Sequence, residues 1–300
     1  MIENIFLGSK IFGLLAFKEL CNKDPKRWMC IIYDDNDDPR SVIDDFLEFC
    51  RSAGIKFLVT KSNKTIAECI ILQNPSCVFV CGFYRILPKS VIEKKIKILG
   101  IHHGPLPRYR GAAPVVWQLL QNEEFIGSSL FFFDKGMDSG DIIKQIQISN
   151  RPEMYVGECL SELEKMWLTL LPDIFNDLKN NSVTRTSQNS ETSTYCAPRK
   201  PIDGKIDWTQ SATIIARFIR AQSDPYPGAF FVYKDIRWKI HDFKIFERPT
   251  YGVPGRVAGR IDDYTLVCCG ESTGLLIRSL KAKDEIVAAN TIMEYSGDLS

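Results

Sequence analysis

The chain has 300 residues, 45% of them hydrophobic, so it is long enough to bury one large core or two modest ones. Its 38 basic and 37 acidic residues leave a formal net charge of +1, which supplies no overall field to hold a polyanion, so a nucleic-acid partner is not expected. The sequence opens without a basic segment followed by a long apolar run, and no stretch is long enough to span a bilayer, so we expect an unprocessed cytoplasmic protein without a membrane partner.

The first half of the sequence alternates short β-type runs with longer amphipathic runs, which is typical of a mostly parallel sheet with helices on both faces. Strands are expected at 3–7, 28–33, 55–60, 78–81, 98–102 and 129–133. Helices are expected at 11–20, 41–53, 65–72, 115–121 and 155–178. The acidic run at 34–38 is expected to be a solvated loop rather than a cation site. These elements predict a Rossmann-like α/β fold with at least six strands.

The pattern changes after the long helix. A polar stretch at 180–194 is rich in Ser, Thr and Asn, and short strands follow Gly204 at turn-punctuated spacing. One helix is expected at 211–221, and strands are expected at 230–233 and 237–243. Short strands of this kind predict a small, OB-like β-barrel. We therefore expect a catalytic domain at 1–185, a linker at 186–204 and a C-terminal β-barrel domain at 205–300.

The ten cysteines lie mostly in apolar runs, and no C-x-x-C pair occurs. Zinc sites and disulfide frameworks both need spacings that this sequence lacks. We therefore expect reduced thiols that pack as small hydrophobes in a reducing compartment, and no bound metal.

Chemistry is expected where the strands end, because ligands bind at the carboxyl ends of the strands in open α/β sheets. The loop 83–88 is apolar and aromatic, which suits a flat heterocycle. His102 and His103 end one strand, and Asp138 follows its neighbour. A carboxylate there could fix the tautomer of an imidazole whose other nitrogen faces a reacting group, which suits acyl transfer. Alternatively, His102 caps the end of its strand and Asp138 caps a turn, each with local hydrogen bonds only. The glycines near Gly8 are too sparse to indicate a dinucleotide.

Several motifs carry a resemblance to a known family. The segments 101–114 and 138–142 are similar to the pattern N-x-H-x-x-L-x-P-x-x-R-G with a downstream D-x-G-D. That pattern is the signature of the 10-formyltetrahydrofolate-dependent formyltransferases. The segment 83–88 resembles the folate-side loop of the family, and 203–208, 219–221 and 225–230 resemble its second domain. The resemblance therefore extends over nearly the whole chain.

The resemblance implies transfer of a formyl group from 10-formyltetrahydrofolate to a primary amine, without a metal. His102 matches the catalytic histidine and Asp138 the catalytic aspartate. The catalytic asparagine of the family falls on Gly100, so His103 or a backbone N–H is expected to replace this donor. The residues assigned to folate binding are Phe83, Tyr84, Ile86, Leu87, Pro88, Asp134, Gly136 and Asp141.

The segment 195–204 indicates the acceptor. Its R-x-P-x-D-G sequence resembles nucleotide-sugar N-formyltransferases of the aminoarabinose and 4-amino-4,6-dideoxysugar type more than the tRNA enzymes. We therefore predict a UDP- or dTDP-linked 4-amino-4,6-dideoxy sugar. Ammonium and guanidinium groups suit its phosphates. The residues assigned to substrate binding are Gly8, Ser9, Lys10, Arg110 and Arg199.

Alternatives remain for both residues and function. Lys10 could lie on the solvated surface, and Arg110 could brace its own loop. The chain could instead be a methionyl-tRNA formyltransferase, a hydrolase in which water replaces the amine, or, because of Gly100, a silent folate or nucleotide-sugar binding protein. A homodimer is left open.

Overall fold

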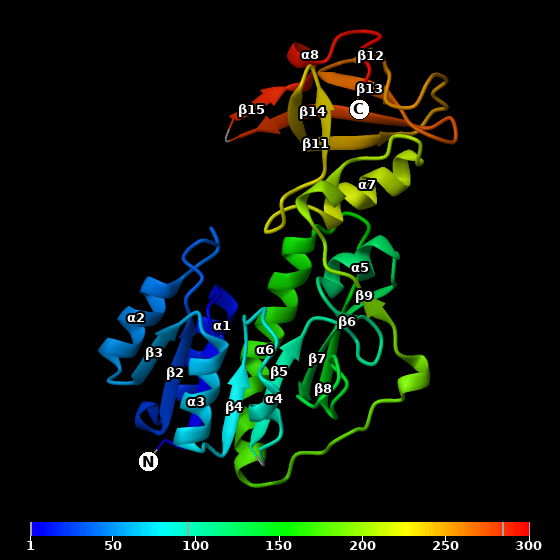
Figure 1. Ribbon diagram of the computed structural model, residues 1–300. Helices are drawn as coiled ribbons and strands as arrows, with labels where there is room; N and C mark the ends of the chain where they lie inside the picture. Colours follow the sequence, from blue (N-terminus) through cyan, green and yellow to red (C-terminus); the bar gives the residue numbers. More distant parts are fainter. Residues whose placement is uncertain (1, 95, 284, 300) are drawn as a thin grey trace. The chain divides into compact units, whose positions relative to one another are not determined.

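The computed structural model describes residues 2–94, 96–283 and 285–299, and Figure 1 shows its elements. The chain divides into two compact units. Unit 1 consists of Met1–Pro114, Gly127–Ile148 and Ser161–Cys196, and unit 2 consists of Val115–Ile126, Ser149–Leu160 and Ala197–Ser300. The chain enters unit 2 for the last time at Ala197.

Among the described residues, the sheet of unit 1 has seven strands in the order β3-β2-β1-β4-β5-β7-β8. Neighbours from β3 to β5 pair in parallel, and β7 pairs antiparallel with β5. The prediction of a mostly parallel sheet is therefore confirmed, with β8 as a strand that we did not predict. The strands are β1 (Asn4–Gly8), β2 (Trp28–Tyr33), β3 (Lys56–Thr60), β4 (Cys77–Val80), β5 (Lys97–His102), β7 (Phe125–Phe132) and β8 (Ile142–Ser149).

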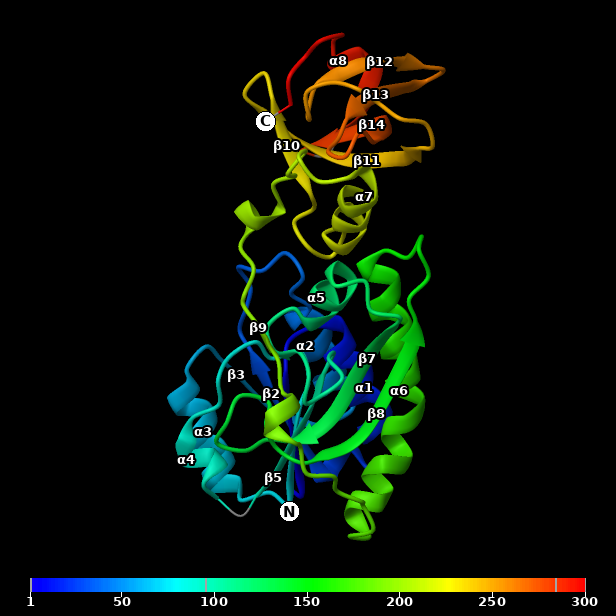
Figure 2. The ribbon, with the colours of Figure 1, turned by 90° about the vertical axis from the view of Figure 1, so that its right-hand side faces the viewer.

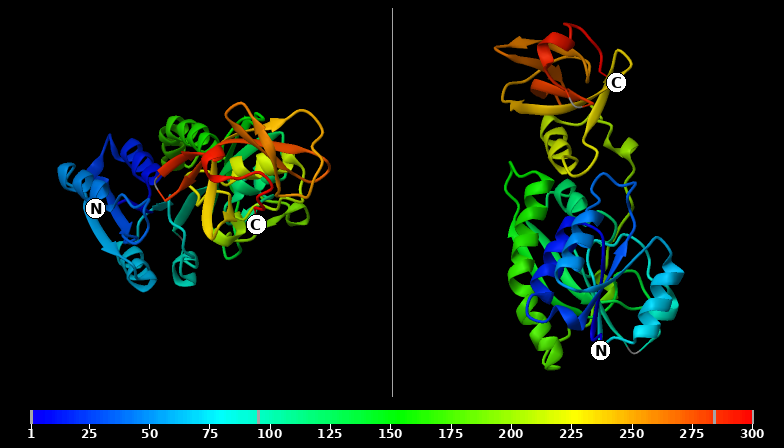
Figure 3. Two further views of the ribbon diagram at one scale, coloured as in Figure 1. Left: turned by 90° about the horizontal axis from the view of Figure 1, so that it is seen from above. Right: turned by 90° about the vertical axis from the view of Figure 1, so that its left-hand side faces the viewer.

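Helices cover both faces of this sheet, as predicted (Figures 2 and 3). Successive side chains of β1 point to opposite faces. Ile5 and Leu7 pack in a cluster that includes Ile66 of α3 and Val91 of α4. Phe6 stacks on Phe17 of α1, with ring centroids 4.7 Å apart, and its ring also contacts α2. Burial on both faces explains why these strands are apolar throughout. The helices are α1 (Ile11–Cys21), α2 (Ile43–Ser52), α3 (Asn63–Gln73), α4 (Lys89–Ile92) and α6 (Val156–Lys179).

The polar stretch after α6 hydrogen-bonds along unit 1. Thr186 forms a backbone bridge with Ile142, and a short strand β9 (Tyr195–Cys196) pairs in parallel with β6 (Arg110–Gly111). Backbone hydrogen bonds therefore hold the segment 186–196 against the start of β8 and against β6. In the described part of the chain, three 3-10 helices lie in the connections, η1 (Pro25–Arg27), η2 (Ser190–Thr192) and η3 (Pro201–Gly204).

Unit 2 is built on a curled antiparallel sheet in the order β10-β11-β14-β13-β12, with β15 paired to β14 (Figure 1). This confirms the predicted small β unit, although the order ends at β10 and β12 instead of closing among the described strands. Trp208, Phe231 and Ile277 lie in its core, against α7. The elements are α5 (Pro114–Leu120), α7 (Ala212–Ala221), β10 (Phe230–Tyr233), β11 (Ile236–Phe246), β12 (Val257–Ile261), β13 (Tyr264–Cys268), β14 (Gly274–Ala282), β15 (Glu285–Ala288) and α8 (Ala289–Ile292).

Two predictions about composition can be compared with the structure. All ten cysteines are free, and all but Cys69 are buried, so packed thiols are confirmed. Within the described ranges, none of the helices combines the length and apolarity that crossing a membrane requires.

Candidate functional site

His102 and Asp138 face each other at the carboxyl edge of the unit 1 sheet. His102 ends β5, and its Nδ1 lies 3.6 Å from Oδ2 of Asp138 in the loop after β7. The backbone N–H of Gly111 donates to the same carboxylate oxygen at 2.8 Å. Asp138 has a positive φ of 49°, in the left-handed region that non-glycine residues rarely adopt. An imidazole and an aligned carboxylate therefore lie where ligands bind in such folds.

The second nitrogen of His102 is also engaged by the protein. Nε2 lies 2.7 Å from the carbonyl oxygen of Tyr109. A carbonyl can only accept, so Nε2 carries the hydrogen. Burial lowers the pKa of His102, although Asp138 and the Tyr109 carbonyl act in the opposite direction. The ring is therefore neutral at pH 7, and its donor is aimed at an oxygen atom of the loop rather than at open solvent.

Gly100 leaves no room for the asparagine of the family. A Cβ at Gly100 would lie 2.7 Å from the Val80 carbonyl oxygen and 2.8 Å from the Phe133 ring. Val80 is the register partner of Gly100 on β4, so the oxygen cannot withdraw without disturbing the sheet. Phe133 is held in turn by stacking on Phe131, at 5.0 Å between ring centroids. The missing donor is therefore replaced by an aromatic ring and not by another polar side chain at this point.

His103 lies among different partners. Its Nδ1 is 3.1 Å from the Ser128 hydroxyl, which also donates to the His102 carbonyl at 3.1 Å and accepts from the Trp167 indole at 2.8 Å. Because the hydroxyl has one hydrogen, this network favours a hydrogen on Nδ1 of His103 and an acceptor at Nε2. Burial and the neighbouring His102 lower the pKa of His103 to about 4. A neutral ring in this tautomer cannot donate from Nε2, so a backbone N–H is the stronger candidate for the missing donor.

The predicted folate-side loop presents two exposed apolar side chains. Tyr84 and Ile86 are 71% and 85% exposed, whereas Leu87 packs in the core cluster under α3 and α4. Phe83 lies edge-on against Tyr33, with ring centroids 5.4 Å apart, and Pro88 caps α4. Exposed rings and branched side chains beside the carboxyl edge suit a flat heterocycle.

Asp134 and Asp141, which were predicted to bind folate, form hydrogen bonds that hold the loop carrying Asp138. Asp134 accepts hydrogen bonds from the Gly136 backbone at 2.9 Å and from the Ser139 hydroxyl at 2.7 Å. Asp141 accepts from the Ser187 hydroxyl at 3.0 Å. Local bonds of this kind fix the loop that carries Asp138.

The loop after β1, which was predicted to bind the substrate, is closely packed. Gly8 is required there because a Cβ would lie 1.9 Å from the Cys81 carbonyl oxygen. Lys10 is only 7% exposed, and its ammonium contacts Asp35 and, at 2.8 Å, Asp38. The Ser9 hydroxyl donates to Asp35 at 2.8 Å. Lys10 on the solvated surface is therefore wrong, because its buried ammonium pairs with Asp35 and Asp38. The acidic run is a loop as expected, but these two carboxylates are not fully solvated.

Arg110 braces its own loop, which was the alternative to ligand binding. It is buried, and its guanidinium donates to the Gln188 side chain at 2.7 and 3.1 Å and to the Tyr195 hydroxyl at 3.4 Å. These contacts tie the loop after β5 to the segment before Ala197.

Arg199 is held within unit 2. Its guanidinium lies 5.1 Å from the ring centroid of Trp117 and donates to the Asp203 carbonyl at 2.6 Å. With the Gln222 amide oriented so that its oxygen faces Arg199, that oxygen accepts two further bonds at 2.6 and 2.9 Å. Burial lowers the pKa of Arg199. Its donors are therefore largely used within the protein.

Replacing Arg199 by lysine is expected to lower the free energy of unfolding by about 1–2 kcal/mol, because the ammonium cannot reproduce the fork of hydrogen bonds or the stacking. Arg260→Lys is the control, since Arg260 is exposed and donates one bond, to the Asn290 carbonyl. We expect the control to change stability by less than about 0.5 kcal/mol in urea unfolding. Equal stability of the two variants would show that the contacts of Arg199 contribute little.

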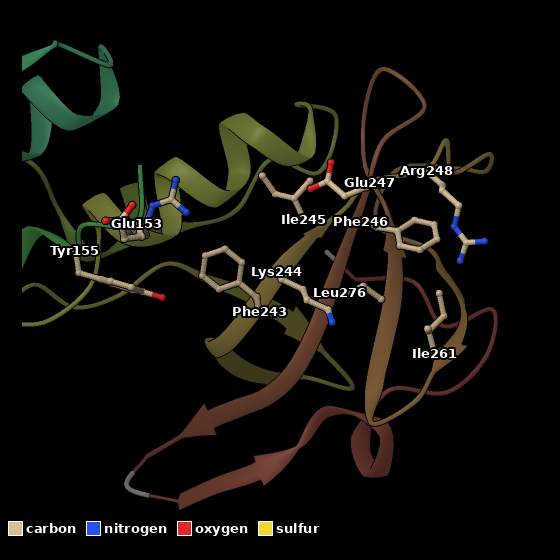
Figure 4. A pocket seen from close by; sticks show the side chains of 11 residues that line it. Glu153, Tyr155, Phe243, Lys244, Ile245, Phe246, Glu247, Arg248, Ile261 and Leu276 are labelled. Atoms are coloured by element: carbon tan, nitrogen blue, oxygen red, sulfur yellow. The ribbon is translucent and has the colours of Figure 1, made fainter. Parts of the chain in front are cut away.

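A cavity of about 720 Å³ lies in unit 2 and contains none of the predicted site residues (Figure 4). Phe243 and Lys244 both line it, although successive side chains of a strand point to opposite faces. The cavity therefore wraps the edge of β11. Among the described residues, no three His, Cys, Asp or Glu side chains gather where they could hold a metal ion.

Comparisons with known proteins identify the family of the chain. Residues 55–169 match the model of the formyl transferase, and residues 199–296 match the model of the formyl transferase C-terminal domain. Together the two matches span more than half of the chain, in chain order. The chain therefore belongs to the formyl transferase family.

The relatives in sequence and in structure differ in their substrates. The chain is 32% identical over 199 residues to the methionyl-tRNA formyltransferase of Alkaliphilus oremlandii, which covers 66% of this chain and 64% of that relative. The first relatives in sequence are matched over 60–66% of their own length, a little under two thirds.

Two solved structures share the fold. One is the N-formyltransferase of Helicobacter canadensis in complex with folinic acid and dTDP-3-aminofucose, with a TM-score of 0.71, 18% identity, and coverage of 92% of this chain and 99% of that chain. The other is WlaRD, a sugar 3N-formyl transferase solved with dTDP and 5-N-formyl-THF, with a TM-score of 0.70, 18% identity, and coverage of 92% and 97%. At this identity the likeness establishes the fold alone.

Sequence reasoning missed one polar residue near this edge. Glu164 lies on α6 in the half-buried class, between Leu160 and Trp167 on the helix face that meets the sheet. The signal was present, because 160, 164, 167 and 171 follow helical spacing, and a glutamate at one of these positions is unusual.

Proposed function

We propose that this chain is a folate-dependent N-formyltransferase, and that residues 1–185 carry its chemistry. The acceptor is the amino group of a nucleotide-linked sugar, in the first place a 4-amino-4,6-dideoxy sugar. The observation that carries the proposal is the convergence of His102 and Asp138, with 3.6 Å between Nδ1 and Oδ2, in a member of the formyl transferase family. 10-Formyltetrahydrofolate supplies the formyl group, and Tyr84 and Ile86 offer its ring system an exposed apolar surface.

His102 and Asp138 stabilise the charges that develop during the reaction and move a proton. The Nε2–H of His102, which donates to the Tyr109 carbonyl in this structure, donates to the formyl oxygen as negative charge develops there. Because Nε2 already carries a hydrogen, the ring becomes an imidazolium by taking the amine proton at Nδ1, where Asp138, held by the Gly111 backbone, stabilises it; the ring then gives up a proton to the departing folate nitrogen. Removal of one such donor typically slows the reaction by a factor of about 100 or more.

A sugar acceptor is supported by the R-x-P-x-D-G segment at 199–204 and by the near-neutral charge. The fold neighbours crystallised with dTDP or a dTDP-amino sugar agree with this choice. The second candidate is methionyl-tRNA, because the relatives in sequence are methionyl-tRNA formyltransferases.

The proposal is tested by incubating the protein with 10-formyltetrahydrofolate and a panel of UDP- and dTDP-linked 3-amino and 4-amino sugars. We expect mass spectrometry to detect a formyl adduct of at least one panel member. A gel-shift assay with initiator tRNA is expected to show no retarded band. A retarded band that weakens steeply with salt, together with an unmodified sugar panel, would favour the tRNA reaction.

A further inference from the structure

The side chain of Gln188 uses its whole hydrogen-bonding capacity between two loops of the site. Its amide nitrogen donates to the backbone carbonyls of Asp138 at 2.9 Å and Gly140 at 2.7 Å. Its amide oxygen accepts two bonds from the Arg110 guanidinium, at 3.1 and 2.7 Å. A glutamine amide has two hydrogens to donate and one oxygen with two lone pairs, so every one of them is used. One side chain of unit 1 therefore joins the loop after β7 to the loop after β5.

A glutamine is an unusual partner for Arg110. Arg110 is only 3% exposed, and within the described ranges no carboxylate forms an ion pair with its guanidinium. Buried charges are normally paired with an opposite charge. A glutamate at position 188 would supply that charge and could accept the same two bonds, but a carboxylate cannot donate to the carbonyls of Asp138 and Gly140. The two donated bonds are therefore what the amide provides beyond support of Arg110.

The donated bonds act on the backbone of Asp138. The φ of 49° at Asp138 lies in the left-handed region, which a non-glycine residue keeps only where its surroundings hold it. Gln188 holds the carbonyl of Asp138 itself and the carbonyl two residues further on. A bond to the Asp138 carbonyl fixes the peptide plane that follows this residue. It therefore limits the directions in which the carboxylate can point.

Gln188 also supports the partner of that carboxylate. The Gly111 N–H, which donates to Oδ2 of Asp138 at 2.8 Å, directly follows Arg110 in β6. The guanidinium of Arg110 is held by Gln188, so one amide anchors both sides of this contact. The same Oδ2 lies 3.6 Å from Nδ1 of His102. Misplacing a group at a reacting centre by about 1 Å can slow the reaction about 100-fold, so a small movement of this loop is expected to matter.

We propose that Gln188 is a positioning residue for formyl transfer, and that it acts through Asp138 by holding the carboxylate against His102. This inference rests on the proposed formyl transfer. Gln188 itself need not touch either substrate. If it only braced Arg110, a glutamate in its place would serve at least as well, and this difference provides the test.

The test compares Gln188→Glu and Gln188→Ala with Asn189→Ala as the control. Glutamate keeps the length of the side chain and both acceptors for Arg110, but loses both donors. Asn189 is the exposed neighbour in the same segment, and its side chain accepts a local bond from the Glu191 backbone at 3.0 Å. Urea unfolding establishes that each variant is folded.

The kinetic assay uses 10-formyltetrahydrofolate and the amino sugar nucleotide that the panel shows to be formylated. Both Gln188 variants are expected to lose about 10- to 100-fold in kcat, with KM values within about threefold of the wild type. The control should keep kcat within about twofold. Full kcat in Gln188→Glu would show that support of Arg110 is sufficient, and would overturn the proposal.

A double-variant cycle shows through which residue Gln188 acts. In the Asp138→Asn background, Gln188→Ala is expected to lower kcat by less than about threefold more, because the carboxylate that it positions is already gone. Losses that multiply in full would show that Gln188 acts independently of Asp138, contrary to the proposal.

Hydrogen exchange gives a readout that does not depend on turnover. The Gly111 N–H is expected to exchange at least about tenfold faster in Gln188→Ala than in the wild type, and at the wild-type rate in Asn189→Ala, when the whole chain is followed by NMR. Unchanged exchange in Gln188→Ala would overturn the positioning role. A wild type that formylates no member of the panel, together with faster Gly111 exchange in Gln188→Ala, would refute the proposed function and leave the hold of Gln188 on Asp138 standing.

Discussion

Removing the His102 imidazole is expected to lower kcat for formyl transfer by a factor of about 100 to 10,000, the range that a positioned proton-transfer group contributes. Asp138→Asn is expected to fall in the same range, because the amide cannot stabilise an imidazolium. The variant keeps an oxygen that can accept from Gly111, so the loop should stay folded. Affinity for the nucleotide sugar is expected to change by less than about threefold, since the proposed roles concern the reaction and not substrate binding.

His241→Ala is the matched control for the histidine variant. His241 is the third histidine of the chain and lies exposed on β11 of unit 2, with Nδ1 3.2 Å from the Ser279 hydroxyl. It should retain full kcat. The double variant His102→Ala/Asp138→Asn is expected to be no slower than the slower single variant, because the two residues act as a unit. Turnover near that of the wild type in either single variant would remove both proposed roles.

Any side chain at Gly100 is expected to destabilise the protein, and asparagine there is expected to leave formyl transfer no faster. The added Cβ would lie 2.7 Å from the Val80 carbonyl, and overpacking of this kind costs about 1–3 kcal/mol. Gly100→Ala should therefore lower the urea midpoint of unfolding measurably. Gly259→Ala is the control, because Gly259 also lies in a strand but has open space where its Cβ would be.

Phe133 provides a second step in this experiment. Combining Gly100→Asn with Phe133→Ala removes the ring, while the Val80 oxygen stays in place. We expect the double variant to remain less stable than Phe133→Ala alone. Full stability together with faster formyl transfer in Gly100→Asn would show that the asparagine geometry of the family is available in this chain, contrary to the packing.

Much of the fold followed from local patterns. The strand expected at 28–33 is β2 (Trp28–Tyr33) to the residue, because an apolar run there is bounded by charged residues on both sides. β8 was missed because it is the last strand in the sheet order and alternates buried with exposed residues, so its sequence IIKQIQIS does not look like a central parallel strand.

The site was predictable only in part. The motifs name His102 and Asp138, but β7 runs antiparallel to β5 and ends beside Leu99, so the loop after β7, and not strand order, brings Asp138 to His102. The pairing of Lys10 with Asp35 and Asp38 depends on a loop fold that no short motif encodes. The tautomer of His102 depends on the Tyr109 carbonyl, which the sequence cannot orient.

Single-turnover transfer of a labelled group tests the central claim most directly. The protein, in molar excess, is mixed with 10-formyltetrahydrofolate that carries ¹³C in the formyl group and with the amino sugar nucleotide found in the panel, and the product is followed by NMR. The wild type should place the label in a sugar formamide, and Asp138→Asn should place almost none there in the same time. Label that stays on the folate, or appears as free formate, would contradict transfer to an amine at the His102–Asp138 pair.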